Sequence, residues 1–97
     1  MEIDMAKHTT ISLVADQWTQ LTDADVLAIT YQNQGPYTVY VVATADASAP
    51  TDRGGALKYD EGHGELNSLL ADMWPGIAGK RVWAWAEDAG KMMVGHT

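Results

Sequence analysis

Short segments in which apolar and polar side chains alternate recur along this chain of 97 residues. The clearest are residues 26–33 and 37–44, which are rich in Val, Ile, Thr and Tyr and flank Gln34-Gly35-Pro36. Alternation of this kind is typical of half-buried β-strands, and Gly and Pro between two such segments are typical of a turn. The pattern predicts a β-hairpin over residues 26–44 that leads into a polar loop over residues 45–55.

Further short strands are predicted wherever the alternation returns. They cover residues 9–15, 18–21, 56–59, 80–86 and 91–96. The last two are separated by Glu87-Asp88-Ala89-Gly90, a turn-like segment, so we expect them to form a closing hairpin. Short strands at this spacing are typical of sandwiches and barrels.

One segment has a helical rather than an extended period. Leu66, Leu69, Leu70 and Met73 recur at the spacing of one helix face, and Pro75-Gly76 would end a helix. We therefore expect one short helix over about residues 65–74. The predicted fold class is all-β: an antiparallel β-sandwich or flattened barrel of about six to seven strands with that helix.

The length and composition indicate one domain, residues 9–97, preceded by an N-terminal arm, residues 1–8, that lacks a clear period. Lys and Arg number 6 against 13 Asp and Glu, and no basic stripe is visible, which argues against a nucleic-acid partner. Neither a long apolar segment nor a basic, apolar leader is visible, so we expect no membrane partner and synthesis in the cytoplasm. With no Cys, disulfides and thiolate metal sites are excluded.

The densest group of proton carriers and potential metal ligands is Asp60-Glu61-Gly62-His63-Gly64-Glu65. A Gly-containing turn does not aim its side chains at one point, and no second cluster completes a site, so a solvated turn is the favoured interpretation. The sequence also lacks a Gly-x-Ser-x-Gly elbow and a Gly-rich loop opening a helix. We expect no catalytic residues, no metal and no cofactor.

Trp83-Ala84-Trp85 places two indoles on one face of one predicted strand. Such a pair could form a stacking platform for a sugar, but burial in the core or in a subunit interface is favoured because Trp is enriched in both settings. Trp18 and Trp74 stand in or near irregular segments, so they are the better candidates for partially exposed anchors.

Several short segments carry a resemblance to a known class of protein. They are Trp18-Thr19-Gln20-Leu21-Thr22, Gln32-Asn33-Gln34-Gly35, Val39-Tyr40-Val41, Ala49-Pro50-Thr51-Asp52, Gly55-Ala56-Leu57, Glu61-Gly62, Val82-Trp83-Ala84 and Met93-Val94. Together they resemble small β-sandwich virion structural proteins of tailed bacteriophages. Residues 65–79 depart from that pattern as an inserted segment, and residues 1–8 match nothing in it.

The resemblance implies a capsid decoration or cement protein, with no catalysis, that binds the exterior of an assembled phage head in the virion. Its partner would be the major capsid protein, and it would form a homo-oligomer, with a trimer favoured. The expected interface comprises Met1, Ile3, Met5 and His8 in the arm, Pro50, Thr51, Asp52 and Arg53 in the loop, and Trp74 and Pro75. Two alternatives stay open: a tail, fibre or head–tail connector component, and a small carbohydrate-binding module built on Trp74, Trp83 or Trp85.

Overall fold

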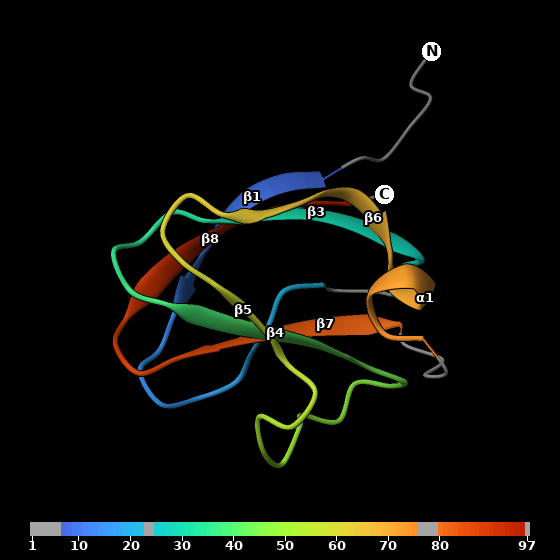
Figure 1. Cartoon of the computed structure of the whole chain (residues 1–97), viewed down its shortest axis with the longest axis horizontal. Coiled ribbons are helices and arrows are strands. Elements are labelled where there is room, and N and C mark those ends of the chain that lie inside the picture. Colours follow the sequence, from blue (N-terminus) through green and yellow to red (C-terminus); the bar gives the residue numbers. More distant parts are fainter. Residues whose placement is uncertain (1–6, 23–24, 76–79, 97) are drawn as a thin grey trace.

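The computed structural model describes residues 7–22, 25–75 and 80–96, and it contains two four-stranded antiparallel sheets that face each other (Figure 1). The first sheet has the order β1-β8-β3-β6 and the second the order β2-β7-β4-β5. The strands are β1 (Lys7–Leu13), β2 (Thr19–Gln20), β3 (Ala28–Asn33), β4 (Val39–Thr44), β5 (Leu57–Tyr59), β6 (Gly64–Leu69), β7 (Arg81–Ala86) and β8 (Gly90–His96). The predicted antiparallel β-sandwich is thus confirmed, and the sheets are not closed into a barrel.

Both predicted hairpins are wrong, because their strands belong to opposite sheets. β3 pairs with β6 and β8, whereas β4 pairs with β5 and β7. β7 and β8 are divided between the sheets in the same way. Residues 34–38 can span about 17 Å when extended, which exceeds the roughly 10 Å between stacked sheets, so this connection is long enough to arch across the sandwich.

The core lies between the two sheets and is built from the inward half of each alternating strand. In β7, Val82, Ala84 and Ala86 are fully buried, and their neighbours point to the other face. The buried apolar residues of the remaining strands are Leu13, Ile29, Tyr31, Val39, Val41, Val42, Ala43, Tyr59, Met92 and Val94. Since the side-chain period of a strand is two, inward residues such as Val39, Val41 and Ala43 alternate with outward ones, and Val42, opposite Trp83, is buried on the outer face.

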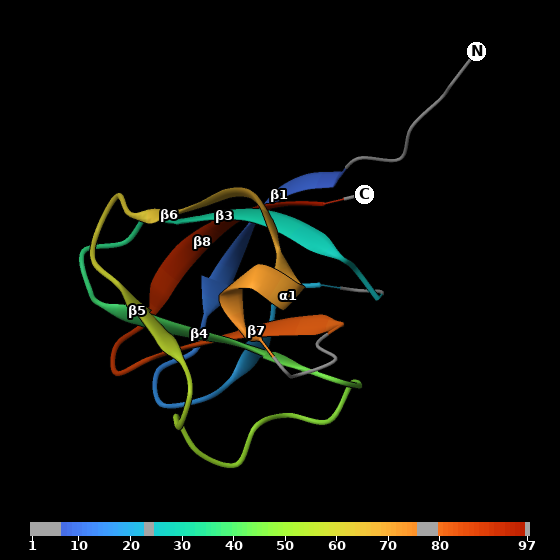
Figure 2. The same ribbon diagram turned by 45° about the vertical axis from the view of Figure 1, so that its right-hand side comes forward.

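The predicted helix over about residues 65–74 is mostly a strand. Gly64–Leu69 forms β6, the edge of the first sheet, and only Leu70–Met73 forms a helix, α1. Asn67 has a positive φ of 45°, and its backbone N–H donates to Thr30 Oγ1 at 2.8 Å, so the chain bulges rather than coils there. α1 lies at one end of the sandwich, beside the space between the sheets (Figure 2). None of the described residues forms a helix long and apolar enough to span a membrane.

The first strand begins earlier than the pattern predicts. β1 includes Lys7 and His8, which pair with His96 and Gly95 of β8. The boundary predicted between an arm ending at residue 8 and a strand starting at residue 9 is therefore two residues too late. The described residues contain eight strands rather than six or seven, because the edge strand β6 replaces most of the predicted helix.

Candidate functional site

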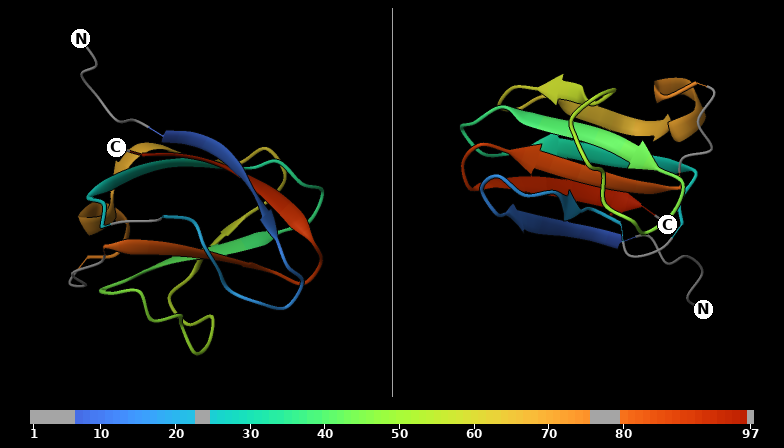
Figure 3. Two further views of the ribbon diagram at one scale, coloured as in Figure 1. Left: turned by 180° about the vertical axis from the view of Figure 1, so that it is seen from behind. Right: turned by 90° about the horizontal axis from the view of Figure 1, so that it is seen from below.

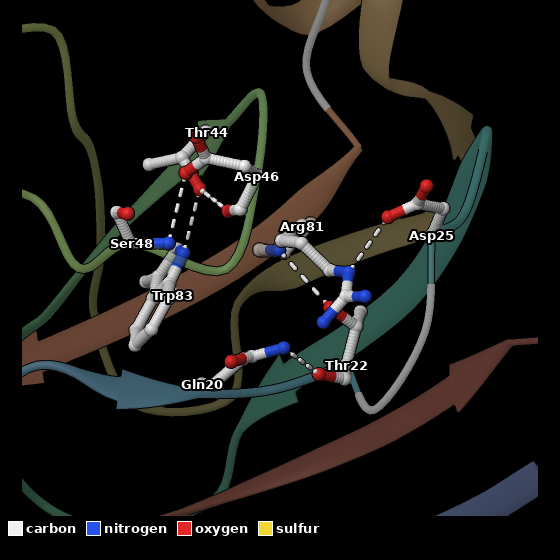
Figure 4. A network of polar contacts seen from close by, with 9 residues as sticks. Gln20, Thr22, Asp25, Thr44, Asp46, Ser48, Arg81 and Trp83 are labelled. Atoms are coloured by element: carbon white, nitrogen blue, oxygen red, sulfur yellow. Dashed lines mark hydrogen bonds and ion pairs between the residues drawn. The ribbon is translucent and has the colours of Figure 1, made fainter.

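The connection between β4 and β5, residues 45–56, folds over the outer face of the second sheet, as Figure 3 (right) shows. Its first turn is held by a set of hydrogen bonds around Thr44 (Figure 4). The Thr44 hydroxyl donates to the Asp46 carbonyl at 2.7 Å and accepts from the Trp83 indole N–H at 2.8 Å, while the Ser48 backbone N–H donates to the Asp46 carboxylate at 2.8 Å. The loop therefore takes a defined path where it leaves β4.

The same face carries a stack of aromatic rings and one cation. Tyr40 and Trp85, on neighbouring strands, meet edge-to-face with ring centroids 6.0 Å apart. The guanidinium of Arg53 lies 4.3 Å from the Trp85 ring centroid and 5.0 Å from that of Tyr40. A cation at this distance from an aromatic face is attracted by the ring quadrupole. Arg53 thus ties the middle of the loop to the sheet.

The sequence favours burial of Trp83 and Trp85 in the core or in a subunit interface over a sugar platform. Strand register places Trp83 and Trp85 on the outer face of the second sheet, not in the core between the sheets. Trp83 is buried, with its N–H paired to Thr44, and Trp85 is half-buried beneath Arg53. Because Trp83 is 7% exposed and the Arg53 guanidinium lies over the Trp85 ring, the alternative of a sugar platform on these two rings does not fit this structure.

The predicted interface residues of the loop are accessible. Thr51, Asp52 and Arg53 are exposed and Pro50 is half-buried. The Asp52 carboxylate accepts a hydrogen bond of 2.9 Å from the Gly54 backbone N–H, which closes a local turn. This part of the loop stands at the surface, as an interface requires.

Trp74 is not the exposed anchor that its sequence context predicts. Its side chain is 5% exposed, and its indole N–H donates to the Gly55 carbonyl at 3.0 Å. The indole is buried because the chain turns through α1 into the end of the sandwich, where Leu70 is buried beside it. Pro75, the next residue, is exposed. Trp74 therefore anchors the chain's own loop, and Trp18, the other candidate anchor, is half-buried against the core.

Four further interface residues were expected in the arm. Met1, Ile3 and Met5 lie outside the described residues. His8 belongs to β1, where its backbone pairs opposite Gly95. The structure does not bring His8 together with the loop of residues 45–56, because β1 is an edge of the other sheet.

An exposed apolar group on the β3–β6 pair does not follow from the pattern of the sequence. Leu66 is 83% exposed, Leu27 is 78% exposed and Leu69 is 50% exposed. Leu69 lies opposite Ala28 on the neighbouring strand, and the Leu70 backbone N–H donates to the Leu27 carbonyl at 2.9 Å, so Leu27 and Leu69 lie near one end of the β3–β6 pair, while Leu66 lies next to the bulge at Asn67 on β6. We call the three exposed leucines the leucine patch. The helical interpretation hid it, because a helix would have turned Leu66 and Leu69 toward the core together with Leu70.

A buried polar chain crosses the sandwich beneath β6. The Tyr31 hydroxyl donates to the Tyr59 hydroxyl at 2.8 Å, and Tyr59 donates to the Glu65 carboxylate at 3.0 Å. The same carboxylate accepts from the Ser68 hydroxyl at 3.1 Å. Burial raises the pKa of Tyr59 to about 12 and raises that of Tyr31 well above its usual range. Both phenols are therefore protonated at neutral pH, and this chain serves as a structural link rather than as a source of protons.

The acidic segment of residues 60–65 forms the turn that its composition predicts. Gly62 adopts a positive φ of 85°, and the His63 backbone N–H donates to the Asp60 carbonyl at 3.0 Å. Its carboxylates diverge: Asp60 accepts from the Thr38 hydroxyl at 3.0 Å, whereas Glu65 turns inward to Tyr59. Among the described residues, no group of three or more His, Asp or Glu side chains is placed to hold a metal ion.

Among the accessible features of the described residues, two are taken as candidate binding surfaces, one on each sheet. The first is the leucine patch. The second is a hollow of about 240 Å³ on the outer face of the second sheet, beside Tyr40. Comparisons of the chain with models of protein families, with curated proteins and with solved structures found no match.

Proposed function

We propose that this protein is a non-enzymatic virion structural protein, a decoration or cement protein that binds the exterior of a phage head and stabilises it. The observation that carries the proposal is the leucine patch. Three large apolar side chains stand exposed beside an edge strand of a small acidic protein. Exposed large apolar side chains on one pair of strands are candidates for a protein interaction site, and their burial is favourable by about 25 cal/mol per Å².

The edge strand adds a second means of attachment. β6 pairs with β3 on one side and has no strand on its other side among the described residues. An edge strand presents backbone N–H and C=O groups that another chain can pair with. A capsid surface that contacts Leu66 and Leu69 would lie next to this edge, so apolar burial and backbone pairing would act together.

The partner in this proposal is the major capsid protein, and the favoured assembly is a homotrimer at a three-fold position of the shell. The net charge of −7 favours a docking surface that is neutral or basic. Stabilisation would follow by mass action, because a ligand that binds only the assembled shell shifts the equilibrium toward that shell.

The proposal is tested on purified particles of the phage that encodes the chain. We expect hundreds of copies per head by quantitative mass spectrometry, a rough expectation from shell symmetry, and density on the exterior of the head by cryo-electron microscopy. Absence from the particles overturns the proposal. A copy number of tens or fewer, with density at the tail or connector, replaces it with the alternative role there.

Leu66→Asp tests whether the leucine patch makes the contact. We expect this variant to bind heads lacking the wild-type protein at least about tenfold more weakly, because a charge replaces an apolar contact. Ser12→Asp is the matched control: Ser12 is exposed on β1, the opposite edge strand of the same sheet, and the charge added is the same. Equal weakening by both variants would show that charge alone, and not the patch, is responsible.

A further inference from the structure

The hollow on the second sheet has the composition of a small binding site. It lies where β4, β5 and the turn between β7 and β8 meet, on the face opposite the core. Its lining residues are Tyr37, Thr38, Tyr40, Lys58, Glu87 and Asp88. At about 240 Å³ it is smaller than the roughly 300–1,000 Å³ typical of sites for drug-sized ligands, so it suits a single ring.

The lining combines aromatic surface with donors and acceptors of hydrogen bonds. Tyr37 is 47% exposed and contributes open ring surface, whereas Tyr40 is half-buried and has the Arg53 guanidinium over its ring. Lys58 supplies an ammonium donor, and Glu87 and Asp88 supply carboxylate acceptors; all three are exposed. A ligand that satisfies this set needs an apolar face and several groups that both donate and accept.

We propose that this hollow binds a neutral saccharide through one pyranose ring. The C–H face of a pyranose can pack on a tyrosine ring, and its hydroxyls can donate to Glu87 and Asp88 while accepting from Lys58. Two carboxylates against one ammonium disfavour acidic sugars, and Lys58 disfavours a cationic ligand in the same space. A neutral, hydroxyl-rich ring fits all of these groups.

Parts of the hollow are held in place before a ligand arrives. Tyr40 is fixed by its contacts with Trp85 and Arg53, at 6.0 Å between ring centroids and 5.0 Å from guanidinium to ring. The Thr38 hydroxyl is held by its hydrogen bond to Asp60. A site whose side chains are already ordered loses less entropy on binding. The loop contact of Arg53 that covers Trp85 thereby also holds Tyr40 in place, beside the exposed ring of Tyr37.

The saccharide site lies on the opposite sheet from the leucine patch. Tyr40 and Lys58 are cross-strand neighbours on β4 and β5, whereas Leu66 and Leu69 lie on β6 of the first sheet. A protein attached through the leucine patch would therefore present the hollow away from its support. The saccharide proposal does not depend on that attachment, and each can fail alone.

The test is an NMR titration of the full chain with the methyl glycosides of glucose, galactose, mannose and N-acetylglucosamine. We expect saturable shifts confined to the lining residues for at least one glycoside. Tyr37→Ala should weaken that binding roughly tenfold, because it removes the most exposed ring, while the Tyr37 carbonyl still accepts from the Asn33 amide. Glu87→Gln should weaken it less, because an amide still accepts one hydrogen bond.

Leu66→Ala is the matched control, since it removes a more exposed side chain from the other sheet and should leave the titration unchanged. The proposal is overturned if none of the four glycosides causes saturable shifts, or if the shifts lie outside the lining. It is also overturned if tetramethylammonium binds there and the glycosides do not, because the two tyrosines and two carboxylates would then form a binding site for a cation.

Discussion

The hydroxyl of Tyr31 in one sheet donates a hydrogen bond of 2.8 Å to the hydroxyl of Tyr59 in the other. The two rings also meet edge-to-face, at 5.2 Å between centroids and 88° between planes. Both side chains are buried, and the Tyr59 hydroxyl in turn donates a hydrogen bond to Glu65 of the edge strand β6. The two sheets are therefore aligned by directional contacts as well as by apolar packing.

Tyr59→Phe should destabilise the fold although it removes one oxygen atom. The substitution leaves the Tyr31 hydroxyl with only the Met73 sulfur, a weak acceptor at 3.8 Å, and takes one donor from Glu65. An unpaired buried polar group costs about 1–3 kcal/mol, so we expect the free energy of unfolding in urea to fall by that amount. Tyr37→Phe is the control, because its ring is exposed and the loss should stay within about 0.5 kcal/mol. Equal losses would exclude the polar chain as the cause.

Stability should fall at alkaline pH because the folded state binds the phenolic protons more tightly than the unfolded chain does. The pKa of Tyr59 is raised from 10.0 to about 12, and the pKa of Tyr31 is raised also. Below pH 10 both states are protonated and this contribution is complete; between pH 10 and 12 only the unfolded chain ionises, so stability is lost as pH rises. In this range the free energy of unfolding should fall by about 1.4 kcal/mol per pH unit for each tyrosine.

Urea unfolding at intervals from pH 10 to pH 12 measures this slope. Tyr59→Phe should make it shallower, because one of the two titrating phenols is gone, whereas Tyr37→Phe should leave it unchanged. A slope that Tyr59→Phe leaves unaltered would mean that other groups control the alkaline transition.

Asn33→Asp should be far more harmful than its size suggests. The fully buried Asn33 amide donates to the carbonyls of Tyr37 and Tyr59, at 2.6 and 3.1 Å, and accepts from the Gly35 backbone N–H at 3.0 Å. A carboxylate at this position can still accept from the Gly35 N–H, but it has no N–H to donate. Its negative charge would instead face the carbonyl oxygens of Tyr37 and Tyr59. We expect a loss of at least about 3 kcal/mol, measured by thermal or urea unfolding. Gln34→Glu, at the exposed neighbouring position, adds the same charge and should cost little.

Gly64→Ala should displace the edge strand β6. A Cβ atom at this position would come within about 2 Å of the Tyr31 carbonyl oxygen, a backbone atom that cannot move aside without disturbing β3. We expect a loss of stability of about 2 kcal/mol or more, with faster hydrogen exchange along β6. Gly54→Ala serves as the comparison, because its Cβ would contact the movable Asp52 side chain at 3.2 Å. Unchanged exchange in Gly64→Ala would contradict the close packing of β6 on β3.

The strands and their polar turns could be predicted from local pattern, whereas their pairing could not. Residues 28–33 and 39–44 are strands by alternation alone, but a five-residue connection permits either a hairpin or an arch. The buried amide of Asn33 donates to the carbonyl of Tyr37 within the arch and to that of Tyr59 on β5. Its acceptors are backbone carbonyls, and sequence does not show where those will lie.

The candidate surfaces likewise depend on strand pairing and burial, which local pattern does not predict. The spacing of Leu66, Leu69 and Leu70 fits a helix, yet pairing with β3 and the bulge at Asn67 place the first two at the surface and the third in the core. The Trp74 side chain is suited both to the surface and to the core. In the structure it is buried, and its indole N–H donates a hydrogen bond to Gly55, 19 residues earlier in the chain. Neither outcome follows from local propensity.

By itself, the sequence determined an all-β chain with strands, turns and one short helical segment, because alternation and turn chemistry act over a few residues. Only the tertiary structure decided that consecutive strands cross between sheets, that Arg53 covers Trp85, and that three leucines on and beside the β3–β6 pair stand exposed. The reason is physical: strand pairing, burial and cation–π contacts join residues far apart in the chain, and their energies depend on the whole packed arrangement.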